Sequence, residues 1–407
     1  MDLESGEARA LLGLMLTPGL GPTLVGRCVE AFGSAEAARG GSAARLGQIK
    51  GIAAAKAGEV GRRIDQTFAS GAVDRELEAV GKARARLVHR DDPEYPQLLR
   101  HIPDPPLLLW VRGRLRREDG LALGVVGSRK CSHYGREQAD RLAAQCGSAG
   151  LCIVSGGAYG VDVAAHRAAL RVGARTTAVI GSGLGKPYPE DHVPVFREIV
   201  GGGDGEEGSG AVISELPMQT GPVPQNFPRR NRIISGMSLG VLVVEAAKRS
   251  GALITARLCV EEHGRECMAV PGRIDAPGSA GCHRIIREGW ATLVTSAAEV
   301  LDQLGEAGRL LKRQWEESGA GEAGLSLRAE AKEGGGEAEG EAKGGGFDAT
   351  LTENQRRVVT ALGDGGASLD EVVSATGLGV GVVLAELTVL EVRGVVAREG
   401  GRYARRG

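Results

Sequence analysis

The sequence predicts an α/β protein with a doubly wound, mainly parallel sheet at its centre and a small helical domain before and after that sheet in the chain. Two observations lead to this prediction. Between residues 121 and 303, short apolar runs alternate with helical patterns, and this alternation is typical of βαβ units. Outside that region, apolar residues recur at helical spacing.

The composition limits the number of domains and the function classes. A chain of 407 residues is long enough for about two or three domains. Its 50 Lys and Arg balance its 51 Asp and Glu, so the molecule has no overall positive field for nucleic acid, and any anion site must be local. The aromatic residues, 5 Phe, 5 Tyr and 3 Trp, indicate an aliphatic core and argue against extended base-stacking surfaces.

The seven cysteines show no CxxC spacing, and the seven histidines show no metal-ligand pairing. This pattern favours reduced thiols over a disulfide framework or a zinc site. The first residues hold no apolar signal core, and no uninterrupted apolar run is long enough to span a bilayer. We therefore expect a cytoplasmic protein with no metal, no cofactor and no membrane partner.

The first domain is expected at residues 1–75 and consists of short predicted helices. The turn at Gly19–Gly21 and a weaker one at Gly51 separate its apolar patterns. Such hairpins occur in helix-hairpin-helix modules, where backbone N–H groups point at a phosphate; an ordinary helical bundle is the alternative. Residues 76–120 are expected to connect this domain to the sheet.

The central domain is expected at residues 121–303. Its predicted strands are Leu121–Val126, Cys152–Val154, Thr176–Ile180, Ala211–Ile213, Val241–Val244 and Cys267–Val270. The glycine-rich stretch 201–210 predicts a surface loop between two of them.

The segment 304–350 is rich in Gly, Glu, Ala and Lys. Because it holds too few apolar groups to offset the entropy of ordering, we expect a disordered linker there. Residues 351–407 regain helical periodicity and end in a predicted hairpin at 394–403, a combination that indicates a winged helix. Seven basic residues balance seven acidic ones in this domain, whereas groove-reading helices present Arg, Lys, Asn or Gln to DNA. We therefore favour a protein-contact role for it over the reading of duplex DNA.

The turns after the strands are candidate sites, because ligands of parallel sheets bind beyond the carboxyl ends of the strands. Arg129 follows the first strand, and the glycine fingerprint of NAD and FAD sites is absent. A glycine-rich loop that opens a helix follows the second strand and suits a phosphate. Its candidate residues are Ser155, Gly156, Gly157 and Gly160. Near the end of the third strand, Pro187 follows Lys186 where a P-loop has its Mg²⁺-binding hydroxyl, which argues against ATP hydrolysis.

A cluster of arginines forms the densest positive feature, in the first turn of a helix that Pro228 is expected to open. Cations are disfavoured at the positive end of a helix dipole, so a bound anion is the natural partner. Arginine forks match phosphate oxygens, and a flat ring suits a base. The alternative pairs these arginines with Glu215, Glu245 or Asp162, and we expect at least one such pair. The cluster consists of Phe227, Arg229, Arg230, Asn231 and Arg232.

Glu245 follows the fifth strand and precedes a turn at Ser250 and Gly251. It is a candidate catalytic carboxylate, but support of a neighbouring arginine or loop amide is the favoured interpretation. No Ser/His/Asp or Cys/His arrangement can be assembled from local spacing, and we interpret His166 as a packing or hydrogen-bonding histidine. We predict no catalytic residue.

Taken in order, these motifs resemble the DNA-processing protein A (DprA/Smf) family. The resemblance runs without a break from about residue 95 to residue 302, and the first and last domains resemble the family's three-part layout more weakly. The blocks that carry it include Val126–Arg129, Ser155–Asp162, Phe227–Ile234, Val244–Ala256 and Ala269–Gly272.

The resemblance implies an extended Rossmann-like core, a helix-hairpin-helix or SAM-like first domain and a C-terminal winged helix. It implies a protein without enzymatic activity that binds and protects single-stranded DNA in natural transformation, loads the RecA recombinase onto it and forms a homodimer through the Rossmann-like domain. The DNA-binding residues expected from the resemblance and the charge pattern are Arg129, Ser155, Gly156, Gly157, Gly160, Lys186, Phe227, Arg229, Arg230, Asn231, Arg232, Ser250 and Gly251.

Two departures from the family pattern concern the expected DNA path. Gly185 and Lys186 stand where the family has an aspartate before its Tyr-Pro pair, so a carboxylate is lost and a cation gained. The residues after Pro189 are acidic where some members offer a lysine. The alternative function is that of a nucleotide-binding or nucleoside-monophosphate-hydrolysing protein, with Glu245 or Glu215 as the carboxylate and Arg129 as the phosphate anchor; against it, three arginines are more cation than one phosphate requires.

Overall fold

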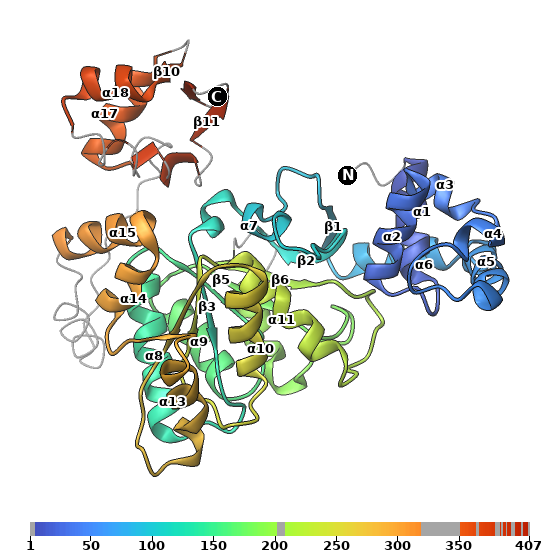
Figure 1. Cartoon of the computed structure of the whole chain (residues 1–407), viewed down its shortest axis with the longest axis horizontal. Coiled ribbons are helices and arrows are strands. Elements are labelled where there is room, and N and C mark those ends of the chain that lie inside the picture. Colours follow the sequence, from blue (N-terminus) through green and yellow to red (C-terminus); the bar gives the residue numbers. More distant parts are fainter. Residues whose placement is uncertain are drawn as a thin grey trace.

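The computed structural model describes residues 5–201, 208–318 and 351–405, the last range with gaps at 364–365, 379–382, 384–385, 388, 392–394 and 400–401. It confirms the predicted α/β class, because a central sheet carries helices on both faces and a helical domain precedes it (Figure 1). Among the helices that the structure describes, none is both long and apolar enough to cross a membrane.

Six helices build the N-terminal part of the chain. They are α1 (Gly6–Leu16), α2 (Pro22–Phe32), α3 (Ala35–Arg39), α4 (Ala43–Leu46), α5 (Ala54–Ala69) and α6 (Ala72–Lys82). The Ser5 hydroxyl caps α1 by accepting the Ala8 N–H at 3.2 Å, and Pro22 occupies the first position of α2, where its missing N–H costs nothing. Helix α6 runs to Lys82, so the helical region extends past the boundary expected at residue 75.

The central sheet has nine strands in the order β1-β2-β6-β5-β4-β3-β7-β8-β9. The strands are β1 (Ala85–His89), β2 (Leu108–Gly113), β3 (Ala122–Val126), β4 (Cys152–Ser155), β5 (Thr176–Val179), β6 (Gly210–Ser214), β7 (Gly240–Val243), β8 (Glu266–Ala269) and β9 (Thr292–Leu293). Strands β3 to β9 pair in parallel, whereas β1 and β2 form an antiparallel edge next to β6. The six predicted strands are confirmed, and the antiparallel edge was missed.

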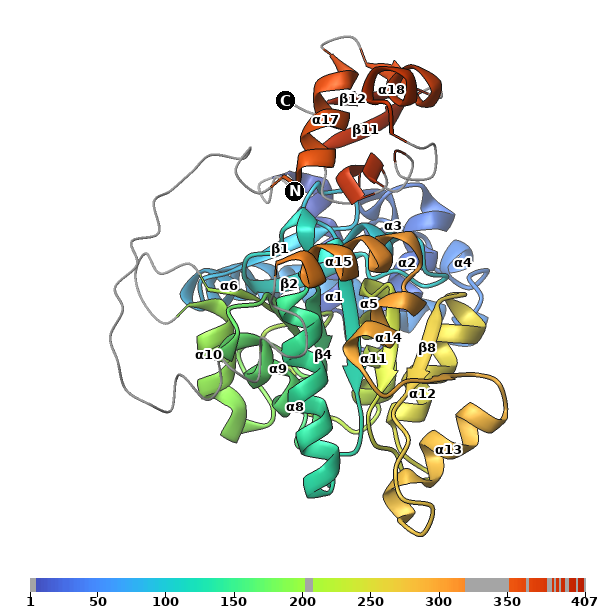
Figure 2. The same cartoon turned by 90° about the vertical axis from the view of Figure 1, so that its left-hand side faces the viewer.

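Helices cover both faces of this sheet. They are α7 (Gln97–Arg100), α8 (His133–Ser148), α9 (Val161–Arg171), α10 (Val193–Val200), α11 (Asn226–Met237), α12 (Ala252–Arg257), α13 (Ala280–Arg287), α14 (Ala297–Gln303) and α15 (Gly305–Glu317). Helices α8 and α9 lie side by side on one face (Figure 2), and α11, α12 and α13 pack on the other. Alternation along β3 decides the faces, since Leu123 and Val125 join the first core and Ala122 and Val126 the second.

Helix α15 corrects the linker prediction. Its residues Leu310, Leu311 and Trp315 are buried and belong to the core beneath α8 and α14, so the chain is ordered well past residue 304. The rest of the expected linker, residues 319–350, lies outside the described residues, as do residues 202–207 of the expected surface loop.

The C-terminal segment has the elements of a winged helix. They are α17 (Glu353–Leu362), β10 (Ala367–Ser368), α18 (Leu369–Thr376), β11 (Val396–Glu399) and β12 (Arg402–Arg405). Strands β11 and β12 form the predicted hairpin, and β10 pairs with β12. Capping boxes begin α17 at Thr352 and α18 at Ser368. Much of the predicted third helix falls outside the described residues.

A buried carboxylate ties the N-terminal helices to the sheet. Glu76 of α6 accepts hydrogen bonds from Trp110 Nε1 of β2 at 2.9 Å and from the Met218 N–H at 2.7 Å. Burial raises the pKa of Glu76, and these two hydrogen bonds oppose that rise. The apolar residues of the N-terminal helices belong to the same core as Leu108 and Trp110 of β2, so the helical domain packs directly on the edge of the sheet.

Candidate functional site

A cavity of about 500 Å³ lies beyond the carboxyl ends of β3, β4 and β7. Strand β3 stands between β4 and β7, so the chain leaves this point in opposite directions, the usual place for a ligand in an open α/β sheet. We call this cavity the strand-end pocket. Six of the DNA-binding residues predicted from the sequence line it: Arg129, Phe227, Arg230, Asn231, Ser250 and Gly251.

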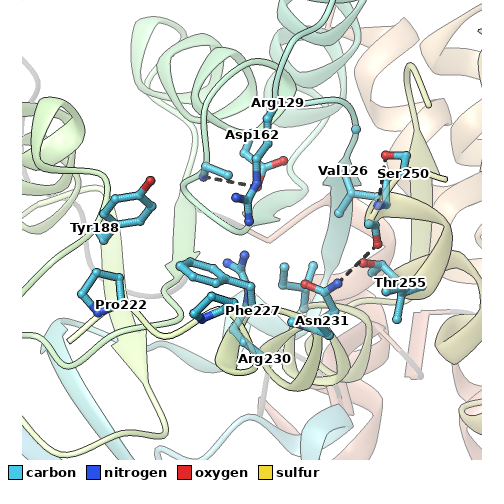
Figure 3. A pocket seen from close by; sticks show the side chains of 18 residues that line it. Val126, Arg129, Asp162, Tyr188, Pro222, Phe227, Arg230, Asn231, Ser250 and Thr255 are labelled. Atoms are coloured by element: carbon cyan, nitrogen blue, oxygen red, sulfur yellow. Dashed lines mark hydrogen bonds between the residues drawn. The ribbon is translucent and has the colours of Figure 1, made fainter. Parts of the chain in front are cut away.

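The rim of the strand-end pocket pairs a cation with an aromatic ring. The exposed Arg129 places its guanidinium carbon 4.9 Å from the centre of the Phe227 ring. The Tyr188 ring meets Phe227 edge-on, with ring centres 5.7 Å apart (Figure 3). Phe227 also rests against the backbone of Gly181, where a Cβ atom would lie 2.8 Å from the ring. The rim thus offers a flat ring, held in place by its neighbours, beside an exposed positive charge.

Arg230 lies at the floor of the pocket and connects α11 to the ends of two strands. It is buried, and its Nη1 group donates to the carbonyl oxygen of Gly156 at 2.6 Å and to that of Val179. Burial lowers the pKa of Arg230 to about 10, so the side chain stays charged at neutral pH. A side chain at Gly156 would overlap this guanidinium, which gives that glycine a packing role. Arg230 therefore anchors α11 to the ends of β4 and β5.

Arg232 points away from the pocket and has acidic partners. It forms an ion pair with the buried Glu215 at 2.5 Å and a longer one with Asp104 at 3.4 Å. Burial raises the pKa of Glu215, and the charge of Arg232 opposes that rise. The expectation that at least one arginine of the cluster is paired internally is confirmed, and Arg232 does not line the strand-end pocket.

Arg229 and Lys186 are exposed but do not line the pocket. Arg229 approaches the start of α2, since a Cβ atom at Gly21 would lie 3.5 Å from its Nη2 group. Lys186 lies in the loop after β5, next to Gly185. No ion pair of either side chain occurs in the part of the chain that the structure describes.

The glycine-rich loop after β4 shapes one wall of the pocket. The Ser155 hydroxyl donates to the Val125 carbonyl at 2.6 Å and is buried, so it does not face a ligand. Gly157 and Gly160 have φ angles of 63° and 77°, which favour glycine, and a side chain at Gly160 would overlap the loop after β3. These residues bring the loops after β3 and β4 into contact.

Two further predicted residues complete the opposite wall. The Asn231 Nδ2 group donates to the Gly251 carbonyl at 3.4 Å, and the Ser250 hydroxyl accepts the Ala252 N–H at 3.3 Å. The first bond joins α11 to the turn that opens α12, and the second lies within that turn. Lys248 and Arg249 are exposed in the same turn, and the motifs in the sequence did not single out these two cations.

Glu245 lies in a neighbouring cavity of about 830 Å³ rather than in the strand-end pocket. Its carboxylate accepts the Ser132 N–H at 3.0 Å and the Ser132 hydroxyl at 2.5 Å. The Ser132 hydroxyl in turn accepts the Gly135 N–H at 3.1 Å and so caps α8. The interpretation of Glu245 as a support for loop amides is confirmed, and neither carboxylate considered for catalysis faces the strand-end pocket.

His166 is a buried hydrogen-bonding residue, as expected. Its Nδ1 atom lies 2.7 Å from the Thr176 hydroxyl, and that hydroxyl donates to the Ile153 carbonyl. Burial lowers the pKa of His166 to about 3, so the ring is neutral. Within the described ranges, no group of three His, Cys, Asp or Glu residues is arranged to hold a metal ion.

Several pocket residues escaped the sequence-based prediction. Pro222 and Pro224 line the pocket from the long loop before α11, a segment without periodicity. Tyr188 follows the turn after β5, and its aromatic ring is the feature of the sequence that could have indicated its place in the pocket. Asp162 was considered as a partner for arginine, yet it lines the pocket and accepts the Ala158 N–H at 3.3 Å. Burial raises the pKa of Asp162, and the nearby Arg230 opposes that rise.

Comparisons with known proteins agree on one family. The family model described as DNA recombination-mediator protein A matches residues 86–305, and the one described as DprA winged helix domain matches residues 348–402. Protein Smf of Escherichia coli (strain K12) is 44% identical over 218 residues, which are 54% of this chain and 56% of that relative. That match therefore spans little more than half of the relative's length. Protein Smf of Synechocystis is 32% identical over 99% of this chain and 100% of its own length.

A solved structure shares the fold. The X-ray structure of DNA processing protein A from Streptococcus pneumoniae is similar with a TM-score of 0.61 and 33% sequence identity. The similarity covers 72% of this chain and 97% of that chain.

Proposed function

Because this chain belongs to the DNA recombination-mediator protein A family, we propose that it binds single-stranded DNA at the strand-end pocket. The observation that carries the proposal is the rim, where the exposed Arg129 lies 4.9 Å from the Phe227 ring. A guanidinium suits a backbone phosphate and a ring suits a base, and this combination binds single strands with little sequence preference.

The proposed contacts divide into two groups. Arg129, Phe227, Asn231 and the turn at Ser250 and Gly251 line the pocket and contact the strand directly. The exposed cations Lys186 and Arg229 bind phosphates on either side of it. The remaining predicted residues, Ser155, Gly156, Gly157, Gly160, Arg230 and Arg232, chiefly hold the loops and α11 in place.

The wider role that we propose is that of a recombination mediator. The strand is bound and protected in natural transformation and handed to the RecA recombinase, and the protein acts by binding, without a catalytic step. The family's description as a recombination mediator supports this role. It is tested by RecA filament formation on a strand covered with single-strand-binding protein: we expect this protein to speed it, and no effect would contradict the proposal.

We also propose that the Rossmann-like domain forms a homodimer and that the winged helix contacts a protein. Ile274, in the loop after β8, is 96% exposed, which supports an apolar contact on the core. Sedimentation of the intact chain tests for the dimer, and Ile274→Asp should shift the monomer–dimer equilibrium toward the monomer. A monomer at all concentrations would contradict this part.

The proposed function is tested by fluorescence anisotropy with a labelled single strand and the same duplex over a salt titration. We expect the single strand to bind more tightly and the affinity to fall as salt rises, with a log–log slope of about 0.7 per neutralised phosphate. Arg129→Ala should weaken binding to all sequences. Arg167→Ala, an exposed arginine of α9 outside the pocket, is the matched control. Equal affinities of the two variants would contradict the proposal.

The hydrolase alternative has no observation in its favour. Glu245 supports Ser132, and Glu215 is paired with Arg232, so neither carboxylate is poised over a ligand in the strand-end pocket. Release of free base from a nucleoside monophosphate, abolished by Glu245→Gln, would restore that alternative.

A further inference from the structure

The floor of the strand-end pocket differs from its rim in charge and burial. Three polar side chains that line it are buried there, Asp162, Arg230 and Asn231, which are 6%, 7% and 9% exposed. A carboxylate repels phosphate, so the phosphate contacts proposed for the rim do not account for an acidic side chain in the lining of this pocket. The following inference rests on the proposed function, because it concerns the same strand in the same pocket.

Each of the three side chains keeps hydrogen-bonding capacity toward the pocket. The Asp162 carboxylate accepts the N–H groups of Ala158 and Gly156, which leaves part of its roughly four lone-pair sites. Asn231 uses its amide nitrogen on Gly251, so its oxygen remains an acceptor. The bonds of Arg230 are made by Nη1, and in Figure 3 its guanidinium points from α11 toward the space beside Phe227.

The walls around this floor are apolar. Pro222, Pro224, Phe227, Ile234 and Ile254 line the pocket. An apolar slot with a few convergent polar groups is typical of sites that bury a ring-shaped ligand, and it desolvates a phosphate without compensation. A nucleobase therefore suits the interior, while the phosphates of the strand stay at the rim with Arg129.

The polar groups of the floor select among the four bases. A carboxylate pairs best with two adjacent donors, and a guanidinium requires an acceptor. Guanine carries N1–H and a 2-amino group side by side, with O6 next to them. Adenine and cytosine offer one amino group beside an acceptor that a carboxylate repels, and thymine has a single N–H between two acceptors.

We infer that the floor of the strand-end pocket holds one guanine of the bound strand, with N1–H and the 2-amino group donating to Asp162 and O6 accepting from Arg230. Asn231 offers a further acceptor beside them. The protein then binds single strands of any sequence through the rim but prefers the register that places a guanine in the pocket.

The test is competition anisotropy with short thymidine strands that carry one central guanine, hypoxanthine, adenine or cytosine. Hypoxanthine keeps O6 and N1–H and lacks the 2-amino group, so it isolates the contact with Asp162. We expect the strand with guanine to bind about tenfold more tightly than the all-thymidine strand, in line with a bidentate base contact. The strand with hypoxanthine should fall between them.

A variant pair assigns the preference to Asp162. Asp162→Asn should bring the affinity ratio of guanine to hypoxanthine close to one, because the amide no longer offers two acceptor oxygens. Asp140→Asn is the matched control, since Asp140 pairs with Arg171 on the outer helices and should leave the ratio unchanged. The base series on the unmodified protein remains a test even if Asp162→Asn unfolds.

The outcomes separate this inference from the proposed function. Equal binding of all strands, still weakened by Arg129→Ala, would overturn the guanine site and leave the proposed function standing. A guanine preference that survives Asp162→Asn in a folded protein would overturn the role of Asp162. Failure to bind any strand would overturn the proposed function and the inference with it.

Discussion

Charged residues have different roles in two neighbouring cavities at the carboxyl ends of the strands. In the cavity around Glu245, the carboxylate accepts both the N–H and the hydroxyl of Ser132, and its hydrogen-bonding capacity supports the start of α8. In the strand-end pocket, the exposed Arg129 lies over Phe227 and can turn to a ligand. Position at a strand end therefore makes a residue a candidate, and the partners it already has decide whether it can bind.

The arginine cluster likewise contains residues with and without internal partners, and replacing a paired one should give the largest change in stability. Arg232→Ala would leave the buried Glu215 without its partner, so the free energy of unfolding should fall by about 3–5 kcal/mol. Urea denaturation measures this change. Arg129→Ala, at the exposed rim, should change stability by about 0.5 kcal/mol or less. Similar losses for the two variants would break the distinction between anchoring and binding arginines.

The supporting role of Glu245 predicts a smaller loss of stability. Glu245→Gln weakens charge-assisted hydrogen bonds to Ser132 and should lower the free energy of unfolding by about 1.5–3 kcal/mol. Its affinity for single-stranded DNA should stay as in the unmodified protein, because Glu245 does not line the strand-end pocket. Lost DNA affinity with unchanged stability would show that the two cavities act as one site.

Phe227 tests the binding side of the comparison. Phe227→Ala should weaken single-strand binding by about 1–3 kcal/mol, the usual value of one stacked base, as measured by anisotropy. Phe32→Ala is the control, because Phe32 also lies beside an arginine, Arg45, but in the N-terminal helices. If Phe227→Ala and Phe32→Ala bound the single strand with equal affinity, base stacking at the rim would be excluded.

Two histidines with lowered pKa values predict how the supporting framework responds to pH. Burial lowers the pKa of His166 to about 3 and that of His263 to about 4. The unfolded chain takes up these protons below about pH 6.5, whereas the folded chain does not, so stability falls as the pH falls from there toward 4. His166→Gln should reduce this dependence by about 1.4 kcal/mol per pH unit. An unchanged slope in urea titrations would contradict the buried neutral ring.

The strands and the location of the strand-end pocket follow from the sequence, since apolar runs and the turns after them mark a parallel sheet. The edge strand β1 was missed because Ala85–His89 contains Arg86 and His89, which hide its pairing with β2. Helix α15 was missed because its glycine and glutamate content resembles that of the linker, while three buried side chains hold it.

The sequence could not predict which arginines of α11 have internal partners and which are exposed. Helix α11 begins at Asn226, two residues before Pro228, so the arginines follow the first turn rather than occupy it. Successive helical residues point about 100° apart, and Arg229, Arg230 and Arg232 therefore meet different neighbours. Which of these neighbours offers a carbonyl, a carboxylate or open space depends on segments far away in the chain.

Photocrosslinking tests the central claim most directly. A single strand that carries 5-iodouracil is irradiated with the intact protein, and the crosslinked peptides are identified by mass spectrometry. We expect crosslinks to the peptides that contain Phe227 and Tyr188, lost in Phe227→Ala and retained in Phe32→Ala. Crosslinks confined to the N-terminal helices or to residues 351–405 would contradict the assignment of the DNA site to the strand-end pocket.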